Sequence, residues 1–147
     1  MAFEVQPLSA TLGARVTGVS LEALTDAAWH DVVTAFHDHA LLVFPNQHLS
    51  ASAQLAFAKR FGEIEVMTKN TPTLTLTNRS PSGDRLSDDD DRTLFSRGNE
   101  GWHTDSSYMP LTAKASVVSA HVVPSSGGQT QWADARAAYE ALDDETR

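Results

Sequence analysis

The sequence contains no cysteine among its 147 residues, which excludes disulfide bonds, thiolate metal sites and cysteine nucleophiles. It also lacks an apolar run long enough to cross a bilayer, so we expect no membrane span. The first residues, MAFEVQPLSA, have neither the basic stretch nor the apolar core of a signal peptide. These absences favour a cytoplasmic protein that does not act at a membrane.

Basic residues are also scarce, with 11 Lys and Arg against 19 Asp and Glu, for a formal net charge of −8. Nucleic acid is therefore not expected as a partner, because phosphate contacts need a basic surface. The densest acidic run, Asp88 to Asp91, lacks the alternating ligands and glycine of an EF-hand. It is most simply interpreted as a solvated loop. Length and a hydrophobic fraction of 41% instead fit one globular domain with its own core.

Three segments carry helix signals. Thr25 or Asp26 can cap the first, whose apolar residues recur on one side. Ser50 can cap the second, with Gly62 as its C-terminal stop. Asp134 can cap the third, which has the sequence ARAAYEAL.

Strand patterns are spread along the chain, and some are continuous apolar runs while others alternate. A polar stretch separates the third strand pattern from the fourth, and we expect it to form a long loop. The expected strands are Leu12–Leu21, Ala40–Pro45 (a buried strand), Thr73–Thr77, Ala115–Val123 and Gln129–Trp132, and the expected loop is Asn78–Glu100. The pattern as a whole predicts a mixed α and β fold.

The candidate chemistry lies at His103, Thr104 and Asp105. In a strand, residues two apart project from the same face, so the imidazole and the carboxylate can both point inward. Such a pair supplies two corners of a 2-His-1-carboxylate triad, which suits Fe(II) and leaves positions open for other ligands. H-x-D often arises by chance, however. From these three residues alone, an exposed His and Asp at a loop edge is the simpler interpretation.

The flanking sequence is more specific. The motif WHTDSSY is followed by AKASVVSAHVVPSSGGQTQWADARAAYEAL and preceded, far upstream, by GARVTGVSL and LVFPNQHLSASAQLAFAKRFGEIE. Together these segments resemble the TauD/TfdA family, which includes taurine dioxygenase and 2,4-dichlorophenoxyacetate dioxygenase. The resemblance covers nearly all of the chain except the segment from Met67 to Gly98. It implies a double-stranded β-helix (a jelly roll, clavaminate-synthase-like) with flanking helices, in an α+β fold of which residues 1–147 are the N-terminal portion of a single domain.

Carried over by position, the resemblance implies that His103 and Asp105 bind iron. Thr130 matches the threonine that hydrogen-bonds a carboxylate of 2-oxoglutarate, although it is otherwise an ordinary strand residue after a Gly-Gly turn. Asn99 matches a position near the substrate, although asparagine is equally natural in a turn. Ser106 could offer its backbone N–H to the substrate.

The implied activity is that of an Fe(II)- and 2-oxoglutarate-dependent dioxygenase. Such an enzyme uses O2 to hydroxylate a small, anionic organic substrate and releases succinate and CO2. Met67 stands where taurine dioxygenase has a sulfonate-binding histidine, so taurine is not expected as the substrate. A homo-oligomer is a further expectation from the family.

Two groups that the family needs are not in this sequence: a distal histidine that is the third iron ligand, and an arginine that pairs with 2-oxoglutarate. We expect the chain to be part of a longer enzyme. The alternative is a short, inactive half-barrel that acts as an interaction protein or is completed by a second chain. A metal hydrolase using the same H-x-D is disfavoured, because nothing resembles its general base.

Overall fold

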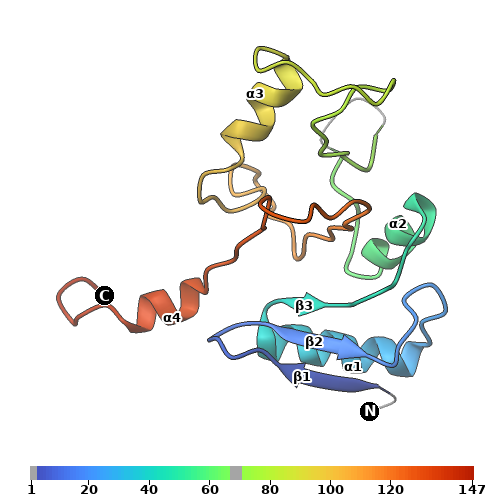
Figure 1. The fold of residues 1–147 in the computed structure, drawn as a ribbon. Helices are drawn as coiled ribbons and strands as arrows, with labels where there is room; N and C mark the ends of the chain where they lie inside the picture. The colour runs from blue at the N-terminus through green and yellow to red at the C-terminus, as the bar shows by residue number, and fades with distance from the viewer. Residues whose placement is uncertain (1–2, 67–70) are drawn as a thin grey trace. The chain divides into compact units, whose positions relative to one another are not determined.

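The computed structural model describes residues 3–66 and 71–147, so Met67 lies outside the described residues. The chain divides into two compact units. Unit 1 comprises Met1–Ala53 and Ser119–Arg147, and unit 2 comprises Gln54–Val118. In chain order, the elements are β1 (Glu4–Pro7), β2 (Ala14–Thr17), α1 (Asp26–His39), β3 (Leu42–Val43), α2 (Ala51–Lys59), α3 (Asp91–Gly98) and α4 (Ala135–Glu140) (Figure 1).

Unit 1 is built on a three-stranded sheet in the order β1-β2-β3. β1 runs antiparallel to β2 with Val5 opposite Val16, and β3 runs parallel to β2 with Ala14 opposite Leu42. Side chains alternate between the faces of a strand, and Ala14 and Val16 of the central strand share a face on which both are completely buried. The strand expected within Leu12–Leu21 is therefore confirmed as β2.

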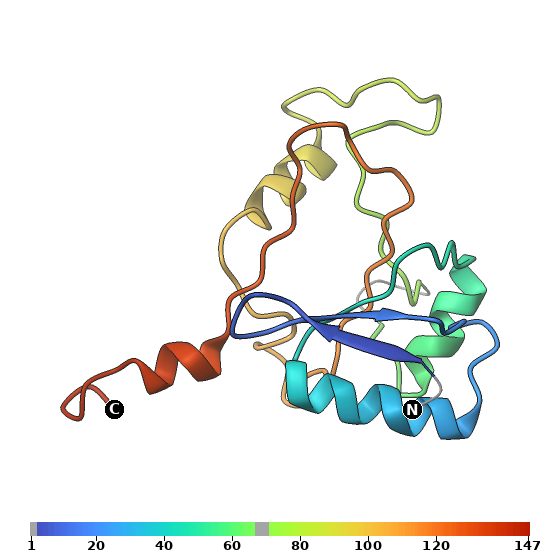
Figure 2. The ribbon, with the colours of Figure 1, turned by 60° about the horizontal axis from the view of Figure 1, so that its bottom comes forward.

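Helix α1 covers this sheet and forms as its sequence predicts (Figures 1 and 2). The Thr25 side chain caps it by accepting a hydrogen bond from the Ala28 N–H at 3.2 Å. Ala28, Val32 and Ala35 are buried, and their spacing of three and four residues places them on one side of a helix. α1 ends at His39, and its C-cap residue Ala40 adopts a left-handed conformation with φ of 59°.

Gln47 connects the loop after β2 to the segment after β3. Its side-chain oxygen accepts from the Leu21 N–H at 2.9 Å, and its side-chain nitrogen donates to the Val19 carbonyl at 3.0 Å and the Pro45 carbonyl at 3.3 Å. One amide side chain thus satisfies backbone groups that have no partner in the sheet.

Helix α4, also in unit 1, begins where expected. The Asp134 side chain caps it by accepting hydrogen bonds from the backbone N–H groups of Arg136 and Ala137. The hydrogen bond from the Arg136 side chain lowers the pKa of Asp134 below its ordinary value.

Helix α2 is likewise confirmed. Ser50 Oγ accepts a hydrogen bond from the Ala53 N–H at 3.2 Å, and a turn bond from the Gly62 N–H to the Lys59 carbonyl follows the last helical residue. Within unit 2, Phe57 is buried and lies edge-on to Phe61, with ring centroids 5.7 Å apart.

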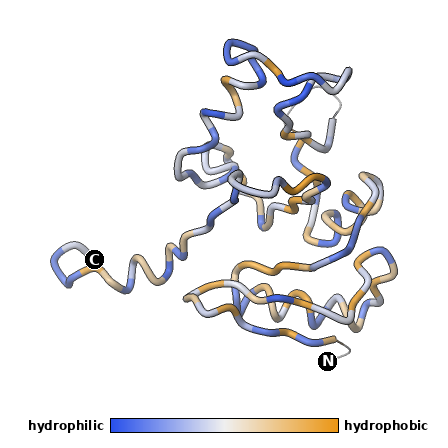
Figure 3. Tube along the Cα trace, in the orientation of Figure 1, coloured by the Kyte–Doolittle hydropathy of each residue, from blue (hydrophilic) through white to orange (hydrophobic). Residues whose placement is uncertain are grey.

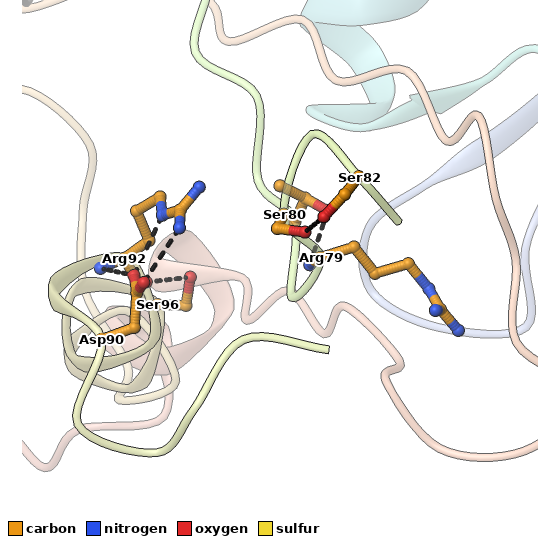
Figure 4. A network of polar contacts seen from close by, with 7 residues as sticks. Arg79, Ser80, Ser82, Asp90, Arg92 and Ser96 are labelled. Atoms are coloured by element: carbon orange, nitrogen blue, oxygen red, sulfur yellow. Dashed lines mark hydrogen bonds and ion pairs between the residues drawn. The ribbon is translucent and has the colours of Figure 1, made fainter. Parts of the chain in front are cut away.

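The stretch expected to be one long loop contains helix α3, so that prediction is wrong over Asp91–Gly98. The acidic run provides the helix start: Asp90 accepts from the Arg92 N–H, and its carboxylate also pairs with the Arg92 side chain (Figure 4). Hydrophilic residues predominate around α3, whereas hydrophobic ones recur along the sheet of unit 1 (Figure 3). Local capping therefore outweighed the polar composition on which the loop prediction rested.

Several strand predictions are not met within the described residues. Thr73–Thr77, Ala115–Val123 and Gln129–Trp132 form no strand. The buried strand expected at Ala40–Pro45 reduces to the two residues of β3, and Val43 in it is exposed. A strand needs a hydrogen-bonded neighbouring strand as well as a suitable side-chain pattern. Among the described residues, the only one of these segments that pairs with a strand is the short β3, which pairs with β2.

The mixed α and β class is confirmed, but the described residues do not form a closed jelly roll. None of the helices in the described ranges combines the length and apolar character needed to cross a bilayer.

Candidate functional site: a histidine–aspartate pair after helix α3

His103 and Asp105 lie in irregular chain just after α3, in unit 2. The strand invoked to place them on one face is absent, so that step of the prediction is wrong. Their side chains nevertheless meet: His103 Nε2 is 3.3 Å from Asp105 Oδ1. A turn starting at Asp105 thus produces the juxtaposition that was expected from a strand.

The second ring nitrogen of His103 has its own partner. His103 Nδ1 lies 2.8 Å from the backbone oxygen of Gly101, and a carbonyl can only accept, so Nδ1 carries the proton. In a neutral imidazole this leaves the lone pair on Nε2, the nitrogen that faces Asp105. A hydrogen bond from the remote nitrogen to a carbonyl is the usual way in which a metal-binding histidine is oriented.

The two oxygens of Asp105 also have different neighbours. Oδ1 faces the His103 ring, whereas Oδ2 accepts a hydrogen bond of 2.7 Å from Ser116 Oγ. Both side chains of the pair are about half exposed, at 49% and 58%, so a ligand can reach them.

The geometry fits a shared cation. Two ligand atoms about 2.1 Å from one ion and at right angles to each other lie about 3.0 Å apart, close to the 3.3 Å found here. A neutral imidazole and a carboxylate are suitable donors for iron. Within residues 3–66 and 71–147, no three His, Asp or Glu side chains gather into a metal site. Among these described residues, His103 and Asp105 are therefore candidates for only two ligands of a metal site.

Ser106, the next residue, is 8% exposed and has a left-handed backbone with φ of 54°. Its hydroxyl donates a short hydrogen bond to Glu65 Oε2, so the side chain is engaged within the protein. The contact joins the segment after α2 to the turn that carries Asp105.

Asn99 follows α3 directly as its C-cap residue, with its N–H bonded to the Ser96 carbonyl at 3.1 Å. Thr130 is an exposed residue in irregular chain of unit 1, whereas Asn99, His103, Asp105 and Ser106 belong to unit 2. The structure thus brings the side chains of His103 and Asp105 together. Asn99 and Ser106 are close to this pair in the sequence.

Sequence reasoning missed Glu65 and Ser116. Glu65 lies within the quoted segment AKRFGEIE, and Ser116 within AKASVVSAH. Their partners are 41 and 11 residues away in sequence. A single sequence carries no signal for such pairings, although both residues lie inside motifs that had been singled out.

The model of the family "Taurine catabolism dioxygenase TauD, TfdA family" matches residues 4–147. The chain belongs to the TauD/TfdA family. An (S)-phenoxypropionate/alpha-ketoglutarate-dioxygenase from Sphingobium herbicidovorans is 51% identical over 148 residues, covering 99% of this chain and 50% of the relative. The alpha-ketoglutarate-dependent 2,4-dichlorophenoxyacetate dioxygenase of Cupriavidus pinatubonensis is 33% identical, covering 97% of this chain and 53% of the relative.

A solved structure agrees with this assignment. The crystal structure of AAD-2 in complex with Mn(II) and N-oxalylglycine matches with a TM-score of 0.87 and 39% identity, over 99% of this TauD/TfdA chain and 52% of that one. The chain spans about half the length of the relatives it matches.

Proposed function

We propose that this TauD/TfdA chain belongs to an Fe(II)- and 2-oxoglutarate-dependent dioxygenase. The observation that carries the proposal is the approach of His103 Nε2 to Asp105 Oδ1, with Nδ1 of the same ring bonded to the Gly101 carbonyl. Family membership supports the proposal that this pair binds iron, and the 3.3 Å separation suits two neighbouring metal ligands.

The roles divide as follows. His103 and Asp105 hold the metal, and Thr130 hydrogen-bonds a carboxylate of 2-oxoglutarate. The bound iron, 2-oxoglutarate and O2 together supply the oxidation of a C–H bond, with release of succinate and CO2. The protein positions the reactants and limits access of water, so no side chain of this chain is assigned as a general base.

A distal histidine and an arginine from a further segment complete the site in this proposal. That segment also closes the jelly-roll barrel, of which residues 1–147 are the N-terminal part of one domain. The apolar side chains of Val118 and Val122, which are exposed by 72% and 88% and would share one face of a strand, support this proposal because a barrel would bury that face. A cytoplasmic location and a homo-oligomeric state stay predictions.

The proposed substrate is a small aryloxyalkanoic acid, a class suggested by the phenoxypropionate and dichlorophenoxyacetate enzymes among the relatives. Asn99 and Ser106 flank the iron ligands in sequence and are the residues we assign to its surroundings. Taurine is disfavoured as the substrate because Met67 stands where taurine dioxygenase has a sulfonate-binding histidine.

The test uses the product of the natural reading frame that contains this chain, called here the full-length protein. Anaerobic addition of Fe(II) and 2-oxoglutarate should give a visible charge-transfer band. With O2 and phenoxypropionate the protein should release succinate faster than with taurine. His103→Ala and Asp105→Ala should each abolish band and turnover, whereas His30→Ala, at an exposed histidine of α1, should change neither.

Retention of turnover by either ligand variant would contradict the proposal. A reading frame that ends at Arg147, together with no band in the wild type, would favour the non-catalytic half-barrel. The dioxygenase names of the relatives give that alternative no support.

A further inference from the structure

The Asp105 carboxylate is held at both oxygens by different groups. Oδ1 faces His103 Nε2 at 3.3 Å, and Oδ2 accepts from Ser116 Oγ at 2.7 Å. Since a carboxylate rotates about two side-chain bonds, a fixed donor on one oxygen determines where the other oxygen points. The Ser116 hydroxyl therefore directs Oδ1 toward the imidazole.

Ser116 is itself anchored in unit 2. The next residue, Val117, accepts a hydrogen bond of 3.0 Å at its backbone oxygen from the Gln54 side chain, which belongs to α2. The position of the hydroxyl is thus set by a helix as well as by its own loop. A chain of contacts runs from Gln54 through Val117 and Ser116 to Asp105.

The occupied oxygen has a chemical consequence. A carboxylate can bind a cation through one oxygen or through both. A hydrogen bond to Oδ2 competes with its use as a second metal ligand, and a hydroxyl donor to a carboxylate is a strong, charge-assisted partner. An aspartate restricted to one oxygen occupies one coordination position and leaves the others for cosubstrate.

We propose that Ser116 is a positioning residue for the metal site: its hydroxyl holds Asp105 Oδ2 and presents Oδ1, together with His103 Nε2, as a preformed two-ligand edge. The inference rests on the proposed function, because it takes Asp105 as a metal ligand. Ser116 need not contact substrate or cosubstrate in this role.

The experiment measures Mn(II) binding to the full-length protein, without turnover, by the loss of the free Mn(II) electron paramagnetic resonance signal. Ser116→Ala should weaken Mn(II) binding about tenfold, the lower end of the range for a residue that orients a metal ligand. Ser116→Thr keeps the hydroxyl at an exposed position and should bind Mn(II) about as tightly as the wild type, because the donor to Asp105 is retained.

A matched control removes the same kind of contact elsewhere in unit 2. Ser82 Oγ donates to Asp84 Oδ2 at 2.8 Å in an exposed turn, and Ser82→Ala should leave Mn(II) binding unchanged. If Ser116→Ala binds Mn(II) as tightly as the wild type, the hydroxyl does not position Asp105. An equal loss of Mn(II) affinity in Ser116→Thr and Ser116→Ala would overturn the proposal as well.

Asp105→Ala separates this inference from the proposed function. Loss of Mn(II) binding in Asp105→Ala together with unchanged binding in Ser116→Ala would refute only the positioning role. Unchanged binding in Asp105→Ala would refute the metal site itself.

Discussion

At the scale of single residues, the turn after His103 depends on a buried hydroxyl. Ser106 has a left-handed backbone, which costs a residue with a Cβ on the order of 1 kcal/mol, and its side chain is buried against Glu65. Glu65→Ala leaves this hydroxyl without its acceptor, for which a loss of about 1–3 kcal/mol in the free energy of unfolding is expected. Urea denaturation of the full-length protein measures it.

Glu63 provides the control for this prediction. It lies two residues away in the same segment but is exposed, so Glu63→Ala should change stability by less than about 0.5 kcal/mol. Equal unfolding midpoints for the two variants would show that the Glu65–Ser106 contact contributes nothing to stability.

The same two residues show how far sequence reasoning extends at this scale. It selected Ser106 because that residue follows Asp105, and assigned its backbone N–H to the substrate. The structure gives the side chain a partner 41 residues away. The pair His103 and Asp105 was predictable because its members are local, whereas Glu65 and Ser116 depend on tertiary contacts.

At the scale of secondary-structure elements, α1 depends on its cap. Thr25 Oγ1 accepts from the Ala28 N–H, one of the first-turn N–H groups that lack a helical partner. Thr25→Ala should reduce the free energy of unfolding by about 1 kcal/mol, measured by thermal or urea denaturation.

Thr34, on the exposed side of the same helix, allows a comparison. Its hydroxyl donates back to the His30 carbonyl at 3.1 Å. A hydrogen bond of this kind does not stabilise a helix. Thr34→Ala should therefore be neutral or slightly stabilising, because alanine has the higher helix propensity. If Thr25→Ala and Thr34→Ala reduce the free energy of unfolding by similar amounts, helix propensity or packing, and not the cap, accounts for the effect of Thr25.

Helix α3 should respond to acid through Asp90. Hydrogen bonds from Arg92 lower the pKa of Asp90 to about 2 (Figure 4), below the value of about 3.9 for an unfolded aspartate. A carboxyl whose pKa is lower in the folded state stabilises that state above its unfolded pKa, and this contribution disappears as the pH falls through the folded pKa. We expect α3 to lose stability between about pH 4 and pH 2.

Asp90→Ser tests this expectation, because serine keeps an N-cap acceptor but removes the charge. Amide chemical shifts of α3, followed by NMR during an acid titration, should show a helix loss near pH 2–4 in the wild type that is smaller in Asp90→Ser. Added salt should reduce the difference, since both side chains of the ion pair are partly exposed. Identical titrations would contradict the assigned role.

The elements that were predicted correctly are those that depend on local sequence signals. Helices α1, α2 and α4 were predicted with their caps, since capping and apolar periodicity operate within a few residues. The strands expected at 73–77, 115–123 and 129–132 do not form within the described residues of this chain, because a strand is stabilised by a neighbour that its own sequence does not specify. Helix α3 was missed because its signal, a capping aspartate, was hidden in an acidic run.

At the scale of the whole molecule, the segment Ala115–Val123 is apolar but unpaired. Within the described residues it takes part in no strand pairing, and Val118, Val122 and Val123 are exposed. Exposed apolar segments with strand-like sequence tend to pair with another chain or segment. In the proposed enzyme, Ala115–Val123 pairs with the part of the protein that corresponds to the second half of the relatives. The family resemblance implies that both parts belong to one jelly roll.

Hydrogen exchange distinguishes the candidate partners. In the full-length protein, amides of Ala115–Val123 should exchange slowly, whereas in the 147-residue chain alone they should exchange quickly. Amides of α1 should be protected in both, because its helix bonds and buried face are already formed. Protection of Ala115–Val123 in the short chain that rises with protein concentration would instead identify a second copy as the partner. Fast exchange in the full-length protein would contradict the proposed barrel, because strand pairing there should protect the amides of this segment.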